Sequence, residues 1–400
     1  MGEELAANSL WANTKSTVKL LRSGLGFNVH RWVDDTVRRF RGQQLSGILG
    51  TCDYPSCFLA SAIAERLGLP APPLRDIVLM GHKYYSRQLH TAVIPEATPD
   101  YEPLDPRRPW LGALPFPVFV KPVKGCTSAR AQLAHHPGEL RTILRFDAIT
   151  RLRLLATLKP YQQLLTHHCD GDVPAHWFIA ETPLAGAQAT VDGFVQNGHI
   201  TVQGVVDSVM YPGTNNFRRF DYPSHLPSLI LARMVELTRR LVAATGLDHT
   251  CFNVEFFYDP ARDTIHVIEL NPRMSYQFSD LYRMADGTST YTVQLDLATG
   301  RTVHWNPQAG RYRVATSFVL RRFSNAQVTR VPHDQDIAAL RGFFPDSTVV
   351  TLVAAGKLLS EIRQDVDSFR YAIVNLGGAD AADLDTRWET ARTLLPFSFD

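Results

Sequence analysis

Two apolar stretches flank a short polar turn in residues 251–273, CFNVEFFYDPARDTIHVIELNPR. Apolar and polar residues alternate on both sides of DPARD, which predicts a β-hairpin with a five-residue loop. In the simplest register Glu255 lies opposite Val267 and diagonal to Glu269. Because side chains alternate between the two faces of a strand, four polar side chains then share one face at the open end of the hairpin: Asn253, Glu255, Glu269 and Asn271.

The two glutamates of this hairpin form the first candidate site. Their β-carbons would lie roughly 7 Å apart, close enough for both carboxylates to share a small cation. Among apolar neighbours, burial and mutual repulsion raise the pKa values of two such carboxylates, whereas a divalent cation removes that penalty. The oxygen-only set of Glu255, Glu269 and Asn271 favours Mg²⁺, with Mn²⁺ as the alternative ion. The competing interpretation is an edge hairpin whose glutamates face solvent.

An arginine follows the hairpin at once. Pro272 fixes the chain direction after the second strand, so Arg273 is held next to the acidic pair. A fixed guanidinium beside a cation suits charge that develops on phosphoryl or acyl-phosphate oxygens, which makes Arg273 a candidate catalytic residue. Its alternative role is to neutralise the two glutamates.

A second candidate site lies at residues 116–131, FPVFVKPVKGCTSARA. The pattern predicts a strand that ends at Lys121 and a short turn that contains Gly125 and the hydroxyls of Thr127 and Ser128. Such a turn presents backbone N–H groups and hydroxyls to an anion. The chain contains neither GxxxxGK[ST] nor GxGxxG, which excludes the common phosphate loop and the dinucleotide fingerprint as motifs.

Taken in chain order, several segments together resemble the ATP-grasp superfamily of ligases, in particular its biotin carboxylase and amino-acid ligase branches. They are Lys83, residues 116–131, AETPLAGAQATVDG at 180–193, FNVEFFYD at 252–259 and VIELNPR at 267–273. The resemblance extends over residues 45–300 or so, and the closing motif is its most specific part. It departs from the family in a glycine-poor loop with Arg130, and in a short opening unit.

The resemblance implies ATP and magnesium as cofactors and a role for each matching residue. The ATP-binding set comprises two phosphate-binding lysines, a loop that closes over the phosphates, a hinge for the adenine edge, and an amide where a ribose-binding glutamate is usual. The two lysines are Lys83 and Lys121, and the closing loop contributes Lys124, Gly125, Thr127 and Ser128. The hinge comprises Glu181, Thr182 and Leu184, and the amide is Gln188. The implied metal ligands are Glu255, Glu269 and Asn271, and the implied catalytic residues are Arg273 and Lys121.

The rest of the sequence predicts an α+β fold. Residues 1–82 would form a short N-terminal α/β domain, with strands near 30–33 and 45–51 and a helix that Gly68 ends. We expect a lid region over 83–185, a central antiparallel sheet with the metal site over 186–305, and a C-terminal α+β subdomain over 306–400. Asn197 and Gly198 predict a hairpin turn inside the central sheet.

Composition limits the other function classes. The 41 Lys and Arg against 39 Asp and Glu give a net charge of +2, which argues against nucleic acid or a membrane surface as a partner. Five scattered cysteines without a CxxC pair suggest neither a disulfide framework nor a zinc site. HHCD at 167–170 is interpreted as a polar loop. With no leader peptide or apolar span in the sequence, we expect a cytoplasmic location.

The resemblance implies a ligase that transfers the terminal phosphoryl group of ATP to a carboxylate and lets an amine displace phosphate. The expected substrates are a small carboxylate, an amino acid, and an amine. Candidate substrate residues are Arg218 or Arg219, which could equally be solvated surface charge, and Ser275 and Tyr276 after the catalytic turn. The alternatives are a biotin-carboxylase-like carboxylase, against which the missing carrier domain argues, and a non-catalytic ATP-binding protein. The C-terminal subdomain could also support a homodimer.

Overall fold

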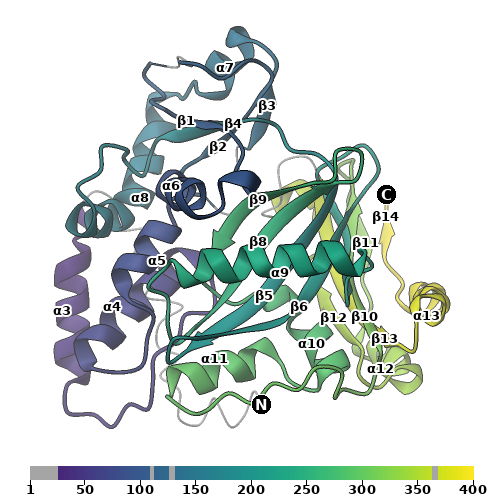
Figure 1. The fold of residues 1–400 in the computed structure, drawn as a ribbon. Coiled ribbons are helices and arrows are strands. Elements are labelled where there is room, and N and C mark those ends of the chain that lie inside the picture. Colours follow the sequence, from purple (N-terminus) through teal and green to yellow (C-terminus); the bar gives the residue numbers. More distant parts are fainter. Residues whose placement is uncertain (1–25, 109–111, 126–130, 363–367) are drawn as a thin grey trace.

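The computed structural model describes residues 26–108, 112–125, 131–362 and 368–400. Its centre is a large antiparallel sheet (Figure 1). The strands are β5 (Ala187–Gln196), β6 (His199–Met210), β7 (Phe217–Tyr222), β8 (Thr250–Asp259), β9 (Thr264–Asn271), β10 (Val314–Arg322), β12 (Thr348–Thr351) and β13 (Phe369–Gly378). They are ordered β12-β13-β10-β7-β6-β5-β8-β9, and every neighbouring pair is antiparallel. The predicted α+β fold with a central antiparallel sheet is confirmed.

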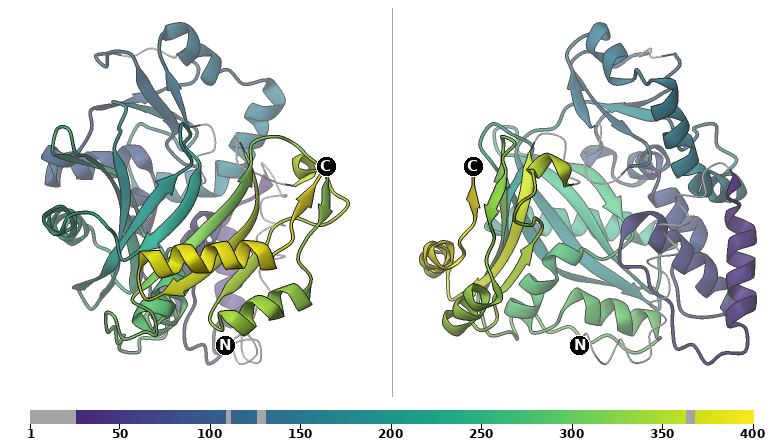
Figure 2. Two further views of the ribbon diagram at one scale, coloured as in Figure 1. Left: turned by 90° about the vertical axis from the view of Figure 1, so that its right-hand side faces the viewer. Right: turned by 180° about the vertical axis from the view of Figure 1, so that it is seen from behind.

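Helices cover both faces of this sheet. On one face α9 (Ser228–Ala243) packs against β5 and β6, and its Met234 belongs to the same core as Val254 of β8. On the other, α11 (Thr290–Ala298) packs through Val293 against Cys251 of the same strand, and α10 (Ser279–Asp286) lies beside it. Since side chains alternate along β8, Glu255 lies on the face of α10 and α11, opposite α9. At the C-terminal end, α12 (Asp334–Phe343) and α13 (Ala381–Leu394) cover β10 and β13 (Figure 2).

A second, smaller sheet lies at one end of the molecule (Figure 2). Its strands are β1 (Tyr101–Leu104), β2 (Val118–Pro122), β3 (Gln132–Ala134) and β4 (Phe178–Glu181), in the order β1-β4-β2-β3. Two helices, α7 (Pro137–Ile143) and α8 (Ala148–His168), connect β3 to β4. His167 and His168 are the last residues of α8, so the first half of the HHCD motif is helical rather than a loop. A further small pair of strands joins β11 (Val328–Arg330) to β14 (Ser398–Phe399).

The N-terminal part of the chain differs from the sequence prediction. Residues 26–97 form α3 (Val29–Phe40), a helical turn at Asp53–Cys57, α4 (Phe58–Leu67), α5 (Leu74–Met80), α6 (Lys83–Val93) and a turn at Pro95–Ala97. The described residues of this range contain no strand, so the strands predicted at 30–33 and 45–51, and with them the α/β character of this part, are wrong. In α3 the buried residues Val29, Val33 and Val37 recur every four positions, which is a helical repeat.

Two local predictions are confirmed. Gly68 ends α4 with a φ of +68°, a backbone conformation that suits glycine. Asn197 and Gly198 have φ values of 52° and 76° and connect β5 to β6 through the tight turn that this pair favours. The domain boundaries at 82, 185 and 305 stay predictions.

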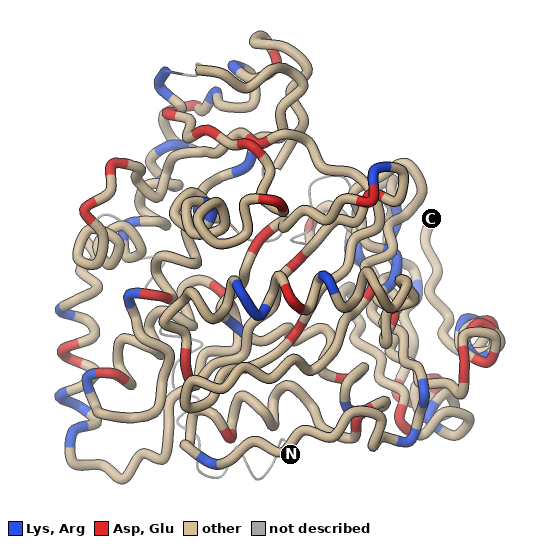
Figure 3. The backbone as a smooth tube through the Cα atoms, in the orientation of Figure 1, with Lys and Arg blue, Asp and Glu red and all other residues tan. Residues whose placement is uncertain are grey.

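Basic and acidic residues interleave along the chain trace (Figure 3), in agreement with the small net charge of +2. Among the described residues, no helix combines the length and the apolar character needed to cross a membrane.

Candidate active site

The β8–β9 hairpin carries the predicted acidic pair, but its register differs from the prediction. Glu255 lies directly opposite Glu269, and Asn253 lies opposite Asn271. Phe256, the next residue of β8, pairs with Val267, so Ile268 is an extra residue in β9 and forms a β-bulge. The predicted pairing of Glu255 with Val267 is therefore wrong for two reasons. Asp259 pairs with Thr264, so the loop has four residues rather than the predicted five, which shifts the register by one residue. The bulge at Ile268 shifts it by one residue more.

The bulge keeps the four polar side chains on one face. The amide nitrogen of Asn271 donates to Asn253 Oδ1 at 3.1 Å, to Glu255 Oε1 at 3.2 Å and to Glu269 Oε1 at 3.2 Å. Val267 turns instead into the core on the opposite face. The prediction of a shared face is confirmed, and the two carboxylates are direct cross-strand neighbours rather than diagonal ones.

The electrostatics of the pair are asymmetric. Burial and then the charge of Glu269 raise the pKa of Glu255 to about 7. Burial also raises the pKa of Glu269, but the charges of Lys83 and Lys121 outweigh it and hold the net pKa below the usual value. Two adjacent, partly buried carboxylates resist carrying two negative charges without a cation between them.

The donor chemistry fits a divalent cation. The amide nitrogen of Asn271 donates to both carboxylates, so oxygens of Glu255 and Glu269 converge on one positively polarised group. With this amide turned over, Glu255, Glu269 and Asn271 would offer the oxygen donors that Mg²⁺ prefers. In the described part of the chain no cluster of three or more His, Cys, Asp and Glu side chains is arranged to hold a metal. A cation here would therefore keep water or phosphate oxygens as its other ligands.

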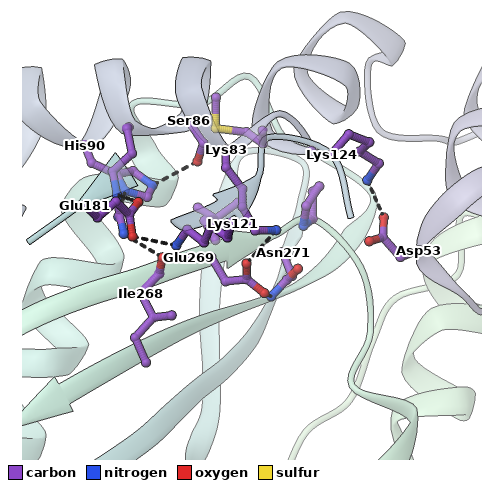
Figure 4. A pocket seen from close by; sticks show the side chains of 15 residues that line it. Asp53, Lys83, Ser86, His90, Lys121, Lys124, Glu181, Ile268, Glu269 and Asn271 are labelled. Atoms are coloured by element: carbon purple, nitrogen blue, oxygen red, sulfur yellow. Dashed lines mark hydrogen bonds and ion pairs between the residues drawn. The ribbon is translucent and has the colours of Figure 1, made fainter. Parts of the chain in front are cut away.

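Glu269 of this pair lines a cavity together with the predicted phosphate-binding lysines Lys83 and Lys121 (Figure 4). Lys83, the first residue of α6, has its ammonium 2.9 Å from Glu269 Oε2 and 3.4 Å from the carbonyl oxygen of Gly125. Lys121 enters from β2 of the small sheet, and Lys124 follows it. The structure therefore brings Lys83, Lys121, Lys124, Gly125, Glu269 and Asn271 around one space. Thr127 and Ser128 lie outside the described residues.

A buried ion cluster forms the back of the cavity, and its central residue was not identified from the sequence. Arg87 of α6 is 2% exposed, and its Nε lies 2.8 Å from Glu181 Oε1. The other oxygen of Glu181 lies 2.7 Å from the ammonium of Lys121. Arg87 also donates to the carbonyl of Ile268 at 2.8 Å and contacts His90 Nδ1 at 2.9 Å. The available signal was the spacing of four between Lys83 and Arg87, which places both on one helix face.

This cluster determines what Glu181 can do. Burial raises the pKa of its carboxylate, but Arg87 and Lys121 lower it more, so the group is an anion with both oxygens bound. The side chain therefore fixes the ammonium of Lys121 toward the cavity. The adenine role implied for residues 181–184 would fall to their backbone and stays a prediction.

Gln188 and Arg273 both contact the hairpin site. The amide nitrogen of Gln188 donates to Glu255 Oε2 at 3.1 Å. Gln188 therefore binds one carboxylate of the acidic pair. Burial lowers the pKa of Arg273, but Asp53, Glu255 and Glu269 raise it more. Its carbonyl accepts from Asn253 Nδ2 at 3.1 Å, which fixes the backbone after Pro272.

The remaining predicted substrate residues have other partners. The Ser275 hydroxyl donates to Asp192 at 2.7 Å, and Tyr276 is 52% exposed. Arg219 Nε lies 2.8 Å from Asp221, and its Nη1 lies 3.8 Å from Asp385 of α13. Arg218 is exposed on β7, a strand that β6 and β5 separate from β8. Substrate binding by these four residues stays a prediction.

Asp192 gives the first testable pH dependence. Burial raises its pKa to about 7, against the opposing effects of the Ser275 and Tyr282 hydroxyls and of Arg273. Since the pKa is higher in the folded than in the unfolded chain, its contribution to stability is complete below about pH 4 and is lost as the pH rises toward 7. Urea unfolding at pH 5 and pH 8 should show the wild type losing up to about 3 kcal/mol more than Asp192→Asn, since one pKa unit equals about 1.4 kcal/mol. Equal losses would contradict the assignment.

Comparison with solved structures identifies the fold. An L-amino acid ligase from Bacillus licheniformis superposes with a TM-score of 0.70 at 14% identity, over 93% of this chain and 85% of that one. The biotin carboxylase domain of 2-oxoglutarate carboxylase from Hydrogenobacter thermophilus gives 0.61 at 15% identity, over 93% and 78%. Phosphoribosylglycinamide synthetase from Anaerococcus prevotii gives 0.60 at 12%, over 92% and 86%.

The described fold and these superpositions show that the chain has the ATP-grasp fold. At identities of 12 to 15% the likeness concerns the fold alone. No protein-family model and no curated protein sequence matches the chain.

Proposed function

We propose that this protein is an ATP-dependent ligase that joins the carboxylate of an amino acid to an amine through an acyl phosphate, releasing ADP and phosphate. One observation carries the proposal: Glu269, which lies directly opposite Glu255, and the ammonium groups of Lys83 and Lys121 line a single cavity. This arrangement offers acidic ligands to a cation and positive charge to a polyphosphate in the same space. The superposition on an L-amino acid ligase supports the substrate class.

The residues of the site have distinct tasks in this chemistry. A Mg²⁺ ion, when bound by Glu255, Glu269 and Asn271, would offset the charge of the phosphate oxygens. Lys83 is paired with Glu269, so it can exchange that carboxylate for a phosphate oxygen while Glu269 turns to the cation. Lys121 is fixed by Glu181 and presents a positioned charge. Arg273 stabilises negative charge that develops on the reacting group.

The proposed reaction has two steps, phosphoryl transfer to the carboxylate and attack of the amine on the acyl phosphate. A carboxylate oxygen attacks the terminal phosphorus of ATP, the bond from that phosphorus to the bridging oxygen breaks, and ADP leaves. The uncharged amine then attacks the acyl carbon, the bond to the phosphate oxygen breaks, and the amine nitrogen loses a proton. Water must be kept out between the steps because it would hydrolyse the acyl phosphate.

The direct test is substrate-dependent ADP formation. We expect the protein with ATP and Mg²⁺ to release ADP and phosphate only when certain amino acids and amines are added, and mass spectrometry should detect an amide product. Release that requires bicarbonate instead would favour the carboxylase chemistry of the biotin carboxylase branch. Release that is independent of any added substrate would contradict ligase activity.

Lys83→Met supplies a second prediction for this site. The methionine keeps most of the side-chain length but removes the charge that would reach the phosphates. We expect the KM for ATP to rise by about tenfold or more, since a charged hydrogen bond is lost. The matched control is Lys357→Met, whose lysine is 60% exposed and pairs with Glu361 at the surface. An unchanged KM in Lys83→Met would contradict the role of Lys83.

A further inference from the structure

The ammonium group of Lys124 lies in a box of aromatic rings beside the cavity. Its Nζ atom is 4.7 Å from the ring centroid of Phe58, 5.3 Å from that of Tyr161 and 5.8 Å from that of Tyr54. Asp53 completes the enclosure, with Oδ1 3.0 Å from the same nitrogen. The Lys124 side chain is only 3% exposed. We call the four residues Asp53, Tyr54, Phe58 and Tyr161 the ammonium box.

The aromatic rings of the ammonium box are positioned by contacts outside it. The rings of Phe58 and Tyr161 meet edge to face, with centroids 5.1 Å apart and an interplanar angle of 85°. The Tyr161 hydroxyl donates to the carbonyl of Val78 at 2.6 Å, and the Tyr54 hydroxyl donates to the carbonyl of Thr157 at 2.7 Å. Because these hydroxyls are bound elsewhere, the interior of the box consists of ring faces and one carboxylate.

This interior suits an alkylammonium group and little else. The negative faces of aromatic rings attract a cation, and the attraction is larger where water is excluded. The carboxylate of Asp53 adds a charged hydrogen bond. Asp53 and Lys124 also line the same cavity as Lys83 and Glu269 (Figure 4), so the carboxylate of the box adjoins the candidate active site.

Lys124 has two possible tasks that exclude each other. The sequence resemblance assigns it to the segment that closes over the phosphates of ATP, whereas the structure places its ammonium in the box. If it moves to a phosphate, it leaves a carboxylate among three ring faces without its nearest cation. Burial raises the pKa of Asp53, but Lys124 first, then Arg273 and Lys83, lower it more, so this carboxylate is an anion. Arg273 and Lys83 act on it from beyond ion-pair distance, since the described residues place only the Lys124 cation within 4.0 Å of the Asp53 carboxylate. An anion in that position is stabilised by a second cation at close range.

We propose that the ammonium box binds the cationic amino group of the substrate, and that this amino group and Lys124 exchange places in it. The inference rests on the proposed function and deepens it. An amine held as an ammonium cannot attack an acyl phosphate, so the bound group belongs to the amino acid whose carboxylate is activated. The attacking amine is a different group. Entry of the amino acid releases Lys124 toward the phosphates, which links recognition of the first substrate to phosphate binding.

The first test measures ammonium binding without turnover. Lys124→Ala in the full-length chain opens the box, and the probe is n-propylammonium chloride, with n-propanol and sodium chloride as matched controls. Calorimetry should show that this variant binds propylammonium at least about tenfold more tightly than the wild type, and that Lys124→Ala/Asp53→Asn loses this gain. Equal binding of propanol and propylammonium, or no gain in a folded Lys124→Ala protein, would overturn the proposal.

The second test asks whether the substrate uses the box. Asp53→Asn should raise the KM for the activated amino acid by about tenfold or more and change the KM for ATP by less than about threefold. Asp34→Asn on α3 is the matched control, because its carboxylate is 44% exposed and pairs with Arg66 on the surface. An unchanged amino-acid KM in Asp53→Asn would overturn the proposal. If the wild type shows no turnover at all, that result contradicts the proposed function. The propylammonium calorimetry then tests cation binding in the ammonium box without relying on activity.

Discussion

Glu269→Gln is expected to lower kcat/KM for substrate-dependent ADP formation by at least about a hundredfold. The substitution keeps the size of the side chain but removes one of two opposing carboxylates, and with it a ligand of the proposed cation. It also removes the exchange partner of Lys83. Coupled-enzyme detection of ADP at saturating amino acid and amine measures the effect.

Two controls separate this effect from misfolding. Glu236→Gln on α9 makes the same change at an exposed position and should leave the rate unchanged. Glu255→Gln should also abolish ADP formation, yet the folded protein should keep or gain stability in the absence of metal, because a repulsion between partly buried carboxylates is removed. An active Glu269→Gln protein would show that the acidic pair is not the catalytic metal site.

Arg87→Met has the largest expected effect on stability. The guanidinium of Arg87 binds Glu181, His90 and the carbonyl of Ile268 while almost fully buried. Methionine fills part of the space, but the carbonyl of Ile268 then loses the hydrogen bond that Arg87 donates. Glu181 keeps its ion pair with Lys121. Removing one member of a buried ion cluster costs about 3–5 kcal/mol, which urea unfolding at neutral pH should detect.

The matched comparison for Arg87→Met is Arg66→Met. Arg66 of α4 pairs with Asp34 at the surface, where such pairs contribute about 1 kcal/mol or less. If both variants lose the same small amount, the cluster of Arg87, Glu181 and Lys121 does not hold the small sheet against β9. The same result would remove the structural reason for the bulge at Ile268.

The hairpin illustrates what the sequence can and cannot predict. Alternation along CFNVEFFY and TIHVIELN identifies the face that carries the acidic pair, because this period belongs to the strand itself. The register depends on the four-residue loop and on the bulge at Ile268. The carbonyl of Ile268 is bound by Arg87, a residue 181 positions away in the chain. A contact of that kind leaves no trace in the local pattern, so the direct opposition of Glu255 and Glu269 could not be predicted.

Arg87 and Asp53 could not be predicted as site residues from the sequence, and the physical reason is the same for both. Arg87 and Asp53 acquire their roles from Glu181 and Lys124, which are 94 and 71 positions away. Neither contact has a signature in the local sequence. The phosphate-binding role of Lys83 and Lys121 follows only from the resemblance to the ATP-grasp pattern. The strand predicted near 30–33 fails for a local reason, because the four-residue spacing of Val29, Val33 and Val37 already indicates a helix.

Crystals grown with Mn²⁺ and a non-hydrolysable ATP analogue would test the central claim most directly. The anomalous signal of manganese locates the cation independently of the surrounding atoms. We expect a peak within ligand distance of both Glu255 and Glu269, with the analogue's phosphates between it and the lysines Lys83 and Lys121. A peak away from this pair, or a nucleotide bound with no cation beside the two glutamates, would contradict the account.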